Sequence, residues 1–185
     1  DYPPVHQKTR GTVNTPMKKL TIFLIIFCVL ILVLSIRGKL GNFTVSDLLT
    51  HSWAEGGPFE LSVERGRFAL SYSVVEDNAL HFSLPVARFA TPDLGYKDGN
   101  YVSLFAPGLS FLLIPGYWIG RLLGAAQIGT FAVISVFSIA NALMILYITR
   151  KLGASLFPAG LASLIFLFAT PAFPYAVSLY QHHVS

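Results

Sequence analysis

The chain has 185 residues, of which 54% are hydrophobic and only 12% are charged. Soluble domains carry about 25% charged residues, so this composition argues against an ordinary soluble domain and predicts an integral membrane protein. The single cysteine, Cys28, rules out an intramolecular disulfide, and the basic residues flank apolar runs, so we expect no nucleic acid partner. Because the sequence opens on Asp1 and stops soon after an apolar run, we expect it to be part of a longer chain.

The first predicted element is a transmembrane helix over residues 20–36, an uncharged run at the lower end of what crosses a core of about 30 Å. A cleaved signal peptide is the alternative, but the run lacks a small-x-small cleavage site. More basic residues precede the run than follow it, so the positive-inside rule places the tail, residues 1–19, in the cytoplasm. These residues are Lys8, Arg10, Lys18 and Lys19 before it, and Arg37 and Lys39 after it.

Residues 37–103 form a polar segment that we expect outside the cytoplasm. Eight of the nine acidic residues lie between Asp47 and Asp98. Residues 64–77 predict an amphipathic helix, although alternating apolar residues from 59 to 74 also permit a hairpin. We expect the helix there, while Asp98-Gly99 is a hairpin signal of its own.

Three further apolar segments follow. Residues 104–123 contain prolines, glycines and aromatic residues, and we expect them to lie along the outer membrane surface as two short helices divided at Pro115, although a full span is the alternative. Residues 128–149 and 156–177 predict two more transmembrane helices, the second interrupted by prolines, and residues 178–185 begin an outer loop. The expected fold is therefore an all-α, multi-pass protein of the cell membrane with a cytoplasmic N-terminus.

Several short words between the apolar runs resemble a known family. They are ERGRFAL at 64–70, VEDN at 75–78, TPDLGYKDGNYVSLFAPG at 91–108 and RKLG at 150–153. Their order over residues 18–185 resembles the N-terminal part of the GT-C membrane glycosyltransferases, in the group of protein mannosyltransferases and aminoarabinose transferases. The resemblance implies an outer loop with juxtamembrane helices and an acidic catalytic residue, and a donor sugar carried on a polyprenyl phosphate.

The resemblance also implies roles for individual residues. The catalytic carboxylate would be Asp93 or Glu64, acting as a general base on an acceptor hydroxyl. Arg67 would contact the donor phosphate, unless it only pairs with Glu64 or extends to the interface. Relatives often carry a lysine directly before the APG word, where this chain has Phe105, so Lys97 or Arg121 would substitute for it.

The sequence also bears on a metal site, on the partners and on a rival function. Adjacent His182 and His183 point apart on a helix and have no third ligand in view, so we assign no metal and expect no cofactor besides the lipid-linked donor. The expected partners are the lipid bilayer and a lipid-linked sugar, with the acceptor unidentified. The rival function is a non-catalytic transporter or scaffold, but the apolar runs contain few of the polar midplane residues that transporters use.

Overall fold

The computed structural model describes residues 15–42, 44–48 and 58–184. Most of the predicted cytoplasmic tail and residues 49–57 of the polar segment lie outside this part of the chain. The described residues form eight α-helices, one short 3-10 helix and one two-stranded sheet. The protein is mostly helical, as predicted, although the hairpin corrects the expectation of an all-α fold.

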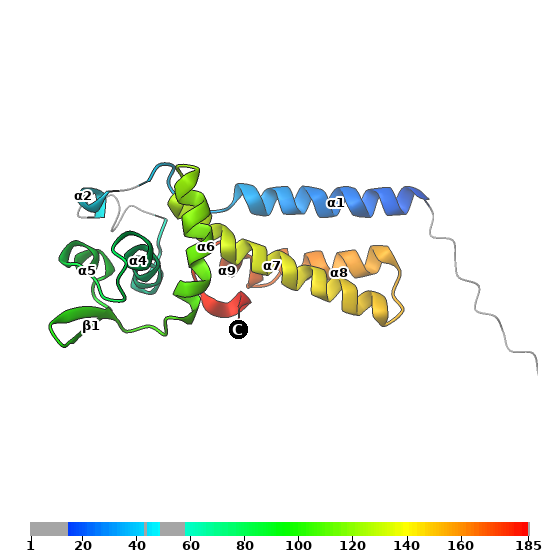
Figure 1. Ribbon diagram of the computed structural model, residues 1–185. Coiled ribbons are helices and arrows are strands. Elements are labelled where there is room, and N and C mark those ends of the chain that lie inside the picture. The colour runs from blue at the N-terminus through cyan, green and yellow to red at the C-terminus, as the bar shows by residue number, and fades with distance from the viewer. Residues whose placement is uncertain (1–14, 43, 49–57, 185) are drawn as a thin grey trace, which may run out of the picture.

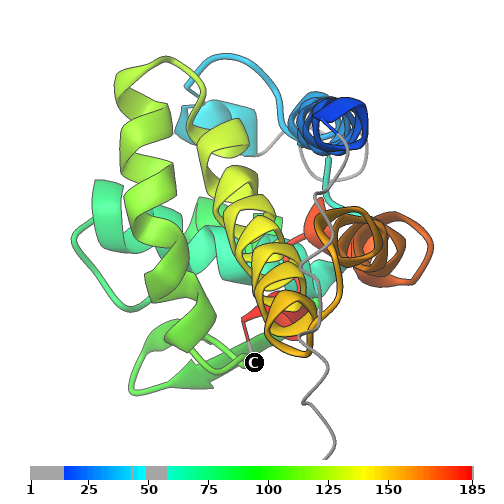
Figure 2. The same ribbon diagram turned by 90° about the vertical axis from the view of Figure 1, so that its right-hand side faces the viewer.

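Three helices lie side by side along one direction: α1 (Thr15–Leu34), α7 (Ala126–Lys151) and α8 (Leu156–Phe168). Figure 1 shows them extending away from the rest of the molecule, and Figure 2 looks along them nearly end on. In the part of the chain that the structure describes, α7 alone is long and apolar enough to cross a membrane, judged by length and composition. The apolar parts of α1 and α8 are shorter.

The polar segment folds into a compact head at the other end of the molecule (Figure 1). The main helix of the head covers residues 62–76, which confirms the prediction of a helix rather than a hairpin over residues 64–77. The head elements are α2 (Val45–Leu48), α4 (Ser62–Glu76), α5 (Leu84–Ala90), β1 (Leu94–Lys97) and β2 (Asn100–Ser103). The two strands pair antiparallel, and Asp98 and Gly99 both have positive φ in the turn, as the Asp-Gly signal predicts.

Helix α6 (Gly108–Leu122) lies across the direction of the three long helices and separates them from the head (Figures 1 and 2). The predicted division at Pro115 is wrong, because α6 continues through this residue. Leu113 and Tyr117, on either side of the proline, are both buried and hold the two halves of the helix in place.

Close contact between glycines fixes the crossing of α6 over α7. A Cβ atom on Gly129 of α7 would come within 2.2 Å of the carbonyl oxygen of Gly116 in α6. Only a residue without a side chain allows the backbones to approach this far. The two glycines therefore determine where the helices cross.

The apolar segment 156–177 does not form one helix. Helix α8 ends at Phe168, and a turn leads to the short helix α9 (Ala172–Ala176) and the 3-10 helix η1 (Gln181–His183). The backbone breaks before Pro171 because proline cannot donate the next helical hydrogen bond and restricts the residue before it. At about 1.5 Å per residue α8 is roughly 20 Å long, short of a membrane core.

Aromatic side chains join the head to α6 and α7. Phe59 lies with its ring centroid 5.2 Å from that of Phe68 and 5.6 Å from that of Phe131, which belongs to α7. Phe68 also contacts Tyr117 of α6 at 5.8 Å. One continuous core therefore holds the head against α6 and α7. A separate cluster joins α1, α7 and α8.

Candidate functional site

Glu64 lies at the first turn of α4 and is completely buried. One carboxylate oxygen accepts the backbone N–H of Glu60 and, at 3.4 Å, that of Leu61, which caps the start of the helix. The other oxygen accepts the N–H of Leu179 at 2.8 Å. Both oxygens of this carboxylate are therefore occupied by backbone donors.

Arg67 follows Glu64 by three residues and lies on the same side of α4. Its guanidinium donates to the carbonyl oxygen of Leu179 at 2.6 Å and to the side chain of Gln181 at 3.2 Å. Burial lowers the pKa of Arg67, while Tyr180 and Glu64 act in the opposite direction. Its Nε is buried without a hydrogen-bond partner in the described structure, so this cation retains unused donor capacity.

Glu64 and Arg67 thus both form hydrogen bonds with the backbone of Leu179. The N–H of Leu179 binds the carboxylate and its C=O binds the guanidinium. This contact spans 112 to 115 positions of sequence and fixes the segment after α9 against the head.

An ion pair lies beside the Glu64 carboxylate, which accepts the backbone N–H of Glu60. Arg37, just after α1, pairs with Glu60, whose side chain is 54% exposed. Burial raises the pKa of Tyr180, and Glu64 and Glu60 raise it further, whereas Arg67 lowers it. Tyr180 directly follows Leu179, whose backbone binds Glu64 and Arg67. We call Arg37, Glu60, Glu64, Arg67 and Tyr180 the junction site.

Sequence reasoning did not identify Arg37 or Glu60 as site residues. Glu60 lies two residues before α4 begins at Ser62, so helical spacing from Glu64 gave no signal for it. Arg37 was counted only as a flanking charge of the first apolar run. Its pairing with Glu60 depends on the path of the chain between α1 and α4.

An open groove of about 340 Å³ lies at the beginning of α6. The first turn of a helix presents backbone N–H groups without helical partners, which favour anions. Arg67 is linked to the groove by Gln181, and its Cζ atom lies 5.9 Å from the centre of the Phe105 ring, just before α6. The groove is lined by Ala106, Gly108, Leu109, Leu112, Gln181 and Val184.

Asp93 lies on a different side of α4. It is partly buried and accepts a hydrogen bond from the hydroxyl of Ser62. Ser62 precedes Arg67 by five residues, which is about 140° around the helix and about 7.5 Å along it. The structure therefore does not bring Asp93 together with Arg67.

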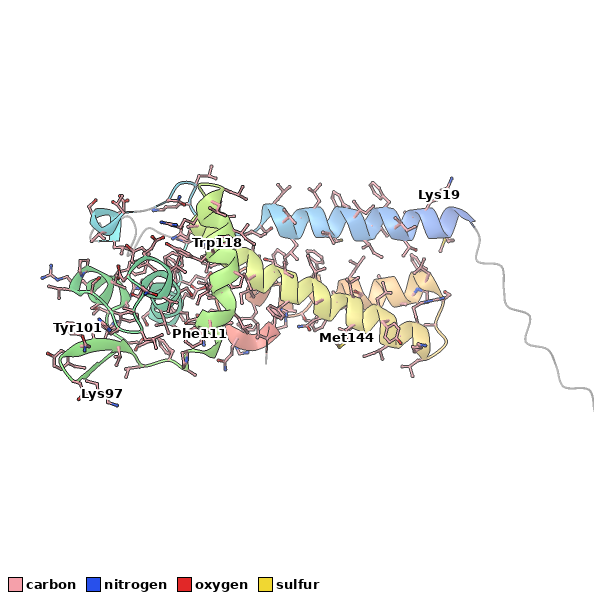
Figure 3. The ribbon with its side chains drawn as sticks, viewed as in Figure 1. Lys19, Lys97, Tyr101, Phe111, Trp118 and Met144 are labelled. Atoms are coloured by element: carbon pink, nitrogen blue, oxygen red, sulfur yellow. The ribbon has the colours of Figure 1, made fainter. Side chains whose placement is uncertain are left out.

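The two substitute cations lie elsewhere as well. Lys97 is exposed on the hairpin, at the end of the molecule away from Lys19 (Figure 3). Arg121 pairs with Glu76 at 2.7 Å, at the far end of α4 from Glu64. Of the five predicted site residues, Glu64 and Arg67 share one contact, and the other three are placed separately.

The adjacent histidines also have different surroundings. His183 is buried, and its Nε2 donates to the carbonyl oxygen of Ala172 at 2.8 Å, while Asn141 donates to the His183 carbonyl oxygen at 2.9 Å. His182 is exposed and packs against Tyr175. Within the described residues, no group of three His, Cys, Asp or Glu side chains is arranged to hold a metal ion.

No protein-family model, curated protein or solved structure matches this chain. The geometry of the junction site and the short motifs that resemble the GT-C family are therefore the two indications of function.

Proposed function

We propose that this chain forms the donor-binding region of a membrane glycosyltransferase, which moves a sugar from a polyprenyl phosphate to an acceptor outside the cytoplasm. The donor phosphate binds beside Arg67 at the start of α6. A carboxylate of the junction site takes the proton from the acceptor hydroxyl as its oxygen bonds to the anomeric carbon of the sugar. The bond between that carbon and the phosphate oxygen breaks, and the polyprenyl phosphate leaves with the electron pair.

The arrangement of the helices supports a membrane orientation. The basic residues Lys19, Arg150 and Lys151 lie at the ends of α1 and α7 that point away from the head. With those ends in the cytoplasm, the positive-inside rule is obeyed and the head faces outward. Helix α6 then runs along the outer surface, as an amphipathic interfacial helix does.

The observation that carries the proposal is the position of Arg67. This cation is only 7% exposed, lies over the ring of Phe105 and donates a hydrogen bond to Gln181, which lines the groove at the start of α6. Phe105 occupies the place where related enzymes often have a lysine, so α4 supplies the positive charge that this loop lacks. A guanidinium and free helical N–H groups together suit a phosphate, and its binding would release Gln181 from Arg67.

Among the three nearby carboxylates, Glu60 is best placed to act as the base. Glu64 is fully buried with both oxygens bound to backbone N–H groups, and Asp93 lies on another side of α4. Glu60 is half exposed, and Arg37 keeps it oriented. Lys97 and Arg121 stay predictions as phosphate contacts, supported only by the family resemblance.

One observation favours the rival function of a scaffold. Glu64 and Arg67 both bind the backbone of Leu179, which is what residues with a purely architectural role would do. A scaffold and an enzyme differ in turnover, so an activity measurement separates them.

The test is sugar transfer from a polyprenyl-phosphate donor in membranes that contain the full-length protein. Glu60→Gln should lower the rate by about 10²- to 10⁴-fold, the usual contribution of a general base, at an unchanged protein level. Asp98→Asn, on the exposed hairpin turn, is the matched control and should leave the rate unchanged. Glu64→Gln and Asp93→Asn complete the set.

The outcomes separate the assignments. Loss of activity in Asp93→Asn or Glu64→Gln alone would move the catalytic role to that residue. Full activity in all three variants would refute a carboxylate base, and a wild-type protein without any transfer would favour the scaffold.

A further inference from the structure

Three aromatic side chains gather beside the junction site. The ring of His182 lies 4.2 Å from that of Tyr175 and 6.1 Å from that of Tyr180, measured between centroids. The two tyrosine rings are 5.8 Å apart and meet edge to face. We call Tyr175, Tyr180 and His182 the ring cluster.

The ring cluster is not part of the buried core. His182 is exposed and the two tyrosines are not fully buried, whereas the neighbouring residues Ser178 and Leu179 are buried. The hydrogen bonds from Leu179 to Glu64 and Arg67 fix the backbone of this segment. The rings of the cluster are therefore presented at the surface on a fixed backbone. Such rings are available to bind a ligand, whereas core residues are not.

Charged groups border the ring cluster. Tyr180 directly follows Leu179, whose backbone binds Glu64 and Arg67. The backbone N–H of Glu60 binds the other oxygen of the Glu64 carboxylate, and the Glu60 side chain is paired with Arg37. A carboxylate accepts hydrogen bonds from hydroxyl groups and a guanidinium donates them. The structure thus places flat apolar faces next to a partly exposed pair of opposite charges.

We propose that the ring cluster binds the pyranose ring of the sugar donor, with Arg37 binding its hydroxyl groups and Glu60 remaining the base for the acceptor. One face of a pyranose presents C–H groups that pack on an aromatic ring, while its hydroxyls point outward to polar partners. This inference rests on the proposed function and adds the part of the site that recognises the sugar. With the phosphate beside Arg67, the sugar would lie on the Glu60 side of the junction.

An ordinary aromatic belt at a membrane surface is the competing explanation, since tyrosines collect there without binding a ligand. The chain offers a matched control in Tyr147, which is 59% exposed near the opposite end of α7 and lies next to Lys151. Replacing a tyrosine of an aromatic belt would leave sugar binding unchanged, whereas replacing a tyrosine that binds the sugar would weaken it.

The test is isothermal titration of the full-length protein in micelles with four probes: farnesyl phosphate, and farnesyl phosphate carrying mannose, glucose or galactose. At least one glycosylated probe should bind about tenfold more tightly than farnesyl phosphate, the scale of one good aromatic contact. Tyr175→Leu and Tyr180→Leu should each reduce this difference, and Tyr175→Leu should leave the affinity for farnesyl phosphate unchanged. Tyr175→Phe, which keeps the ring, and Tyr147→Leu should preserve the difference.

Two results would overturn the inference while leaving the proposed function intact. One is equal affinity for all four probes, and the other is a sugar preference that survives both leucine variants. If farnesyl phosphate itself fails to bind, the proposed phosphate site is wrong. The proposed sugar site at the ring cluster is then wrong as well.

Discussion

Buried charges in this protein are satisfied by backbone and by distant partners. An isolated buried charge costs several kcal/mol, so Glu64 and Arg67 need the hydrogen bonds that they find at Leu179. At the other end of α4, Glu76 accepts from Tyr117 at 2.9 Å and pairs with Arg121. Both ends of α4 are thereby fastened to other elements by charged hydrogen bonds.

The Tyr117–Glu76 contact predicts how stability depends on pH. Burial, and then the hydrogen bond to Glu76, raise the pKa of Tyr117 above its ordinary value of 10.0. Above pH 10 the unfolded chain would lose this proton while the folded chain keeps it, so the free energy of unfolding falls as the pH rises. Tyr117→Phe should weaken this fall.

The measurement is urea unfolding in micelles between pH 7 and about pH 11, with Tyr96→Phe on the exposed hairpin as the control. At pH 7, Tyr117→Phe should be less stable by about 1 to 3 kcal/mol, because a hydrogen bond to a charged group is lost. Equal pH slopes for Tyr117→Phe and the unmutated protein would show that this hydroxyl is not buried.

Sequence reasoning identified some of these residues but not their partners. The words around Glu64 and Arg67 marked both residues, and their spacing suggested a mutual salt bridge. What it could not supply was Leu179, because the contact depends on a turn at Pro171 that brings a distant segment against α4. Glu60 was overlooked because its role depends on Arg37, which lies 23 positions earlier in the chain.

Proline had different effects in two apolar segments, and the difference lies in packing. Helix α6 continues through Pro115 because the residues on both sides are packed against α4 and α7. Before Pro171 the helix breaks instead, and α8 ends at Phe168. The positions of the apolar runs were predictable from composition, whereas their continuity depended on contacts with other elements.

The glycine contact between α6 and α7 is testable at the element scale. Gly129→Ala places a methyl group within 2.2 Å of the Gly116 carbonyl oxygen, so the helices must separate. Such overpacking costs about 1 to 3 kcal/mol, partly offset by the better helix propensity of alanine. Thermal unfolding in micelles should show a lower midpoint for Gly129→Ala.

Gly108→Ala is the control for this experiment, because no atom lies within 4 Å of the added methyl group. It should leave the unfolding midpoint unchanged or raise it slightly. If both variants behaved alike, α6 and α7 would not be in close contact.

On the scale of the whole molecule, the head and the basic helix ends lie at opposite ends of the structure (Figure 3). Composition and charge predicted this separation, because eight of the nine acidic residues lie between Asp47 and Asp98, while basic residues flank the apolar runs. For the crosswise position of α6 the sequence gives only a preference, since a few charges decide between an interfacial and a spanning segment.

The proposed site requires the head to lie outside the membrane and the turn between α7 and α8 to lie in the cytoplasm. Single cysteines introduced as Asp98→Cys in the hairpin and Ser155→Cys in that turn, in a Cys28→Ser background, report on the two sides. With a membrane-impermeant maleimide, Asp98→Cys should be labelled in intact cells and Ser155→Cys only after permeabilisation. Labelling of Ser155→Cys in intact cells, or protection of Asp98→Cys, would contradict the orientation on which the proposed glycosyl transfer depends.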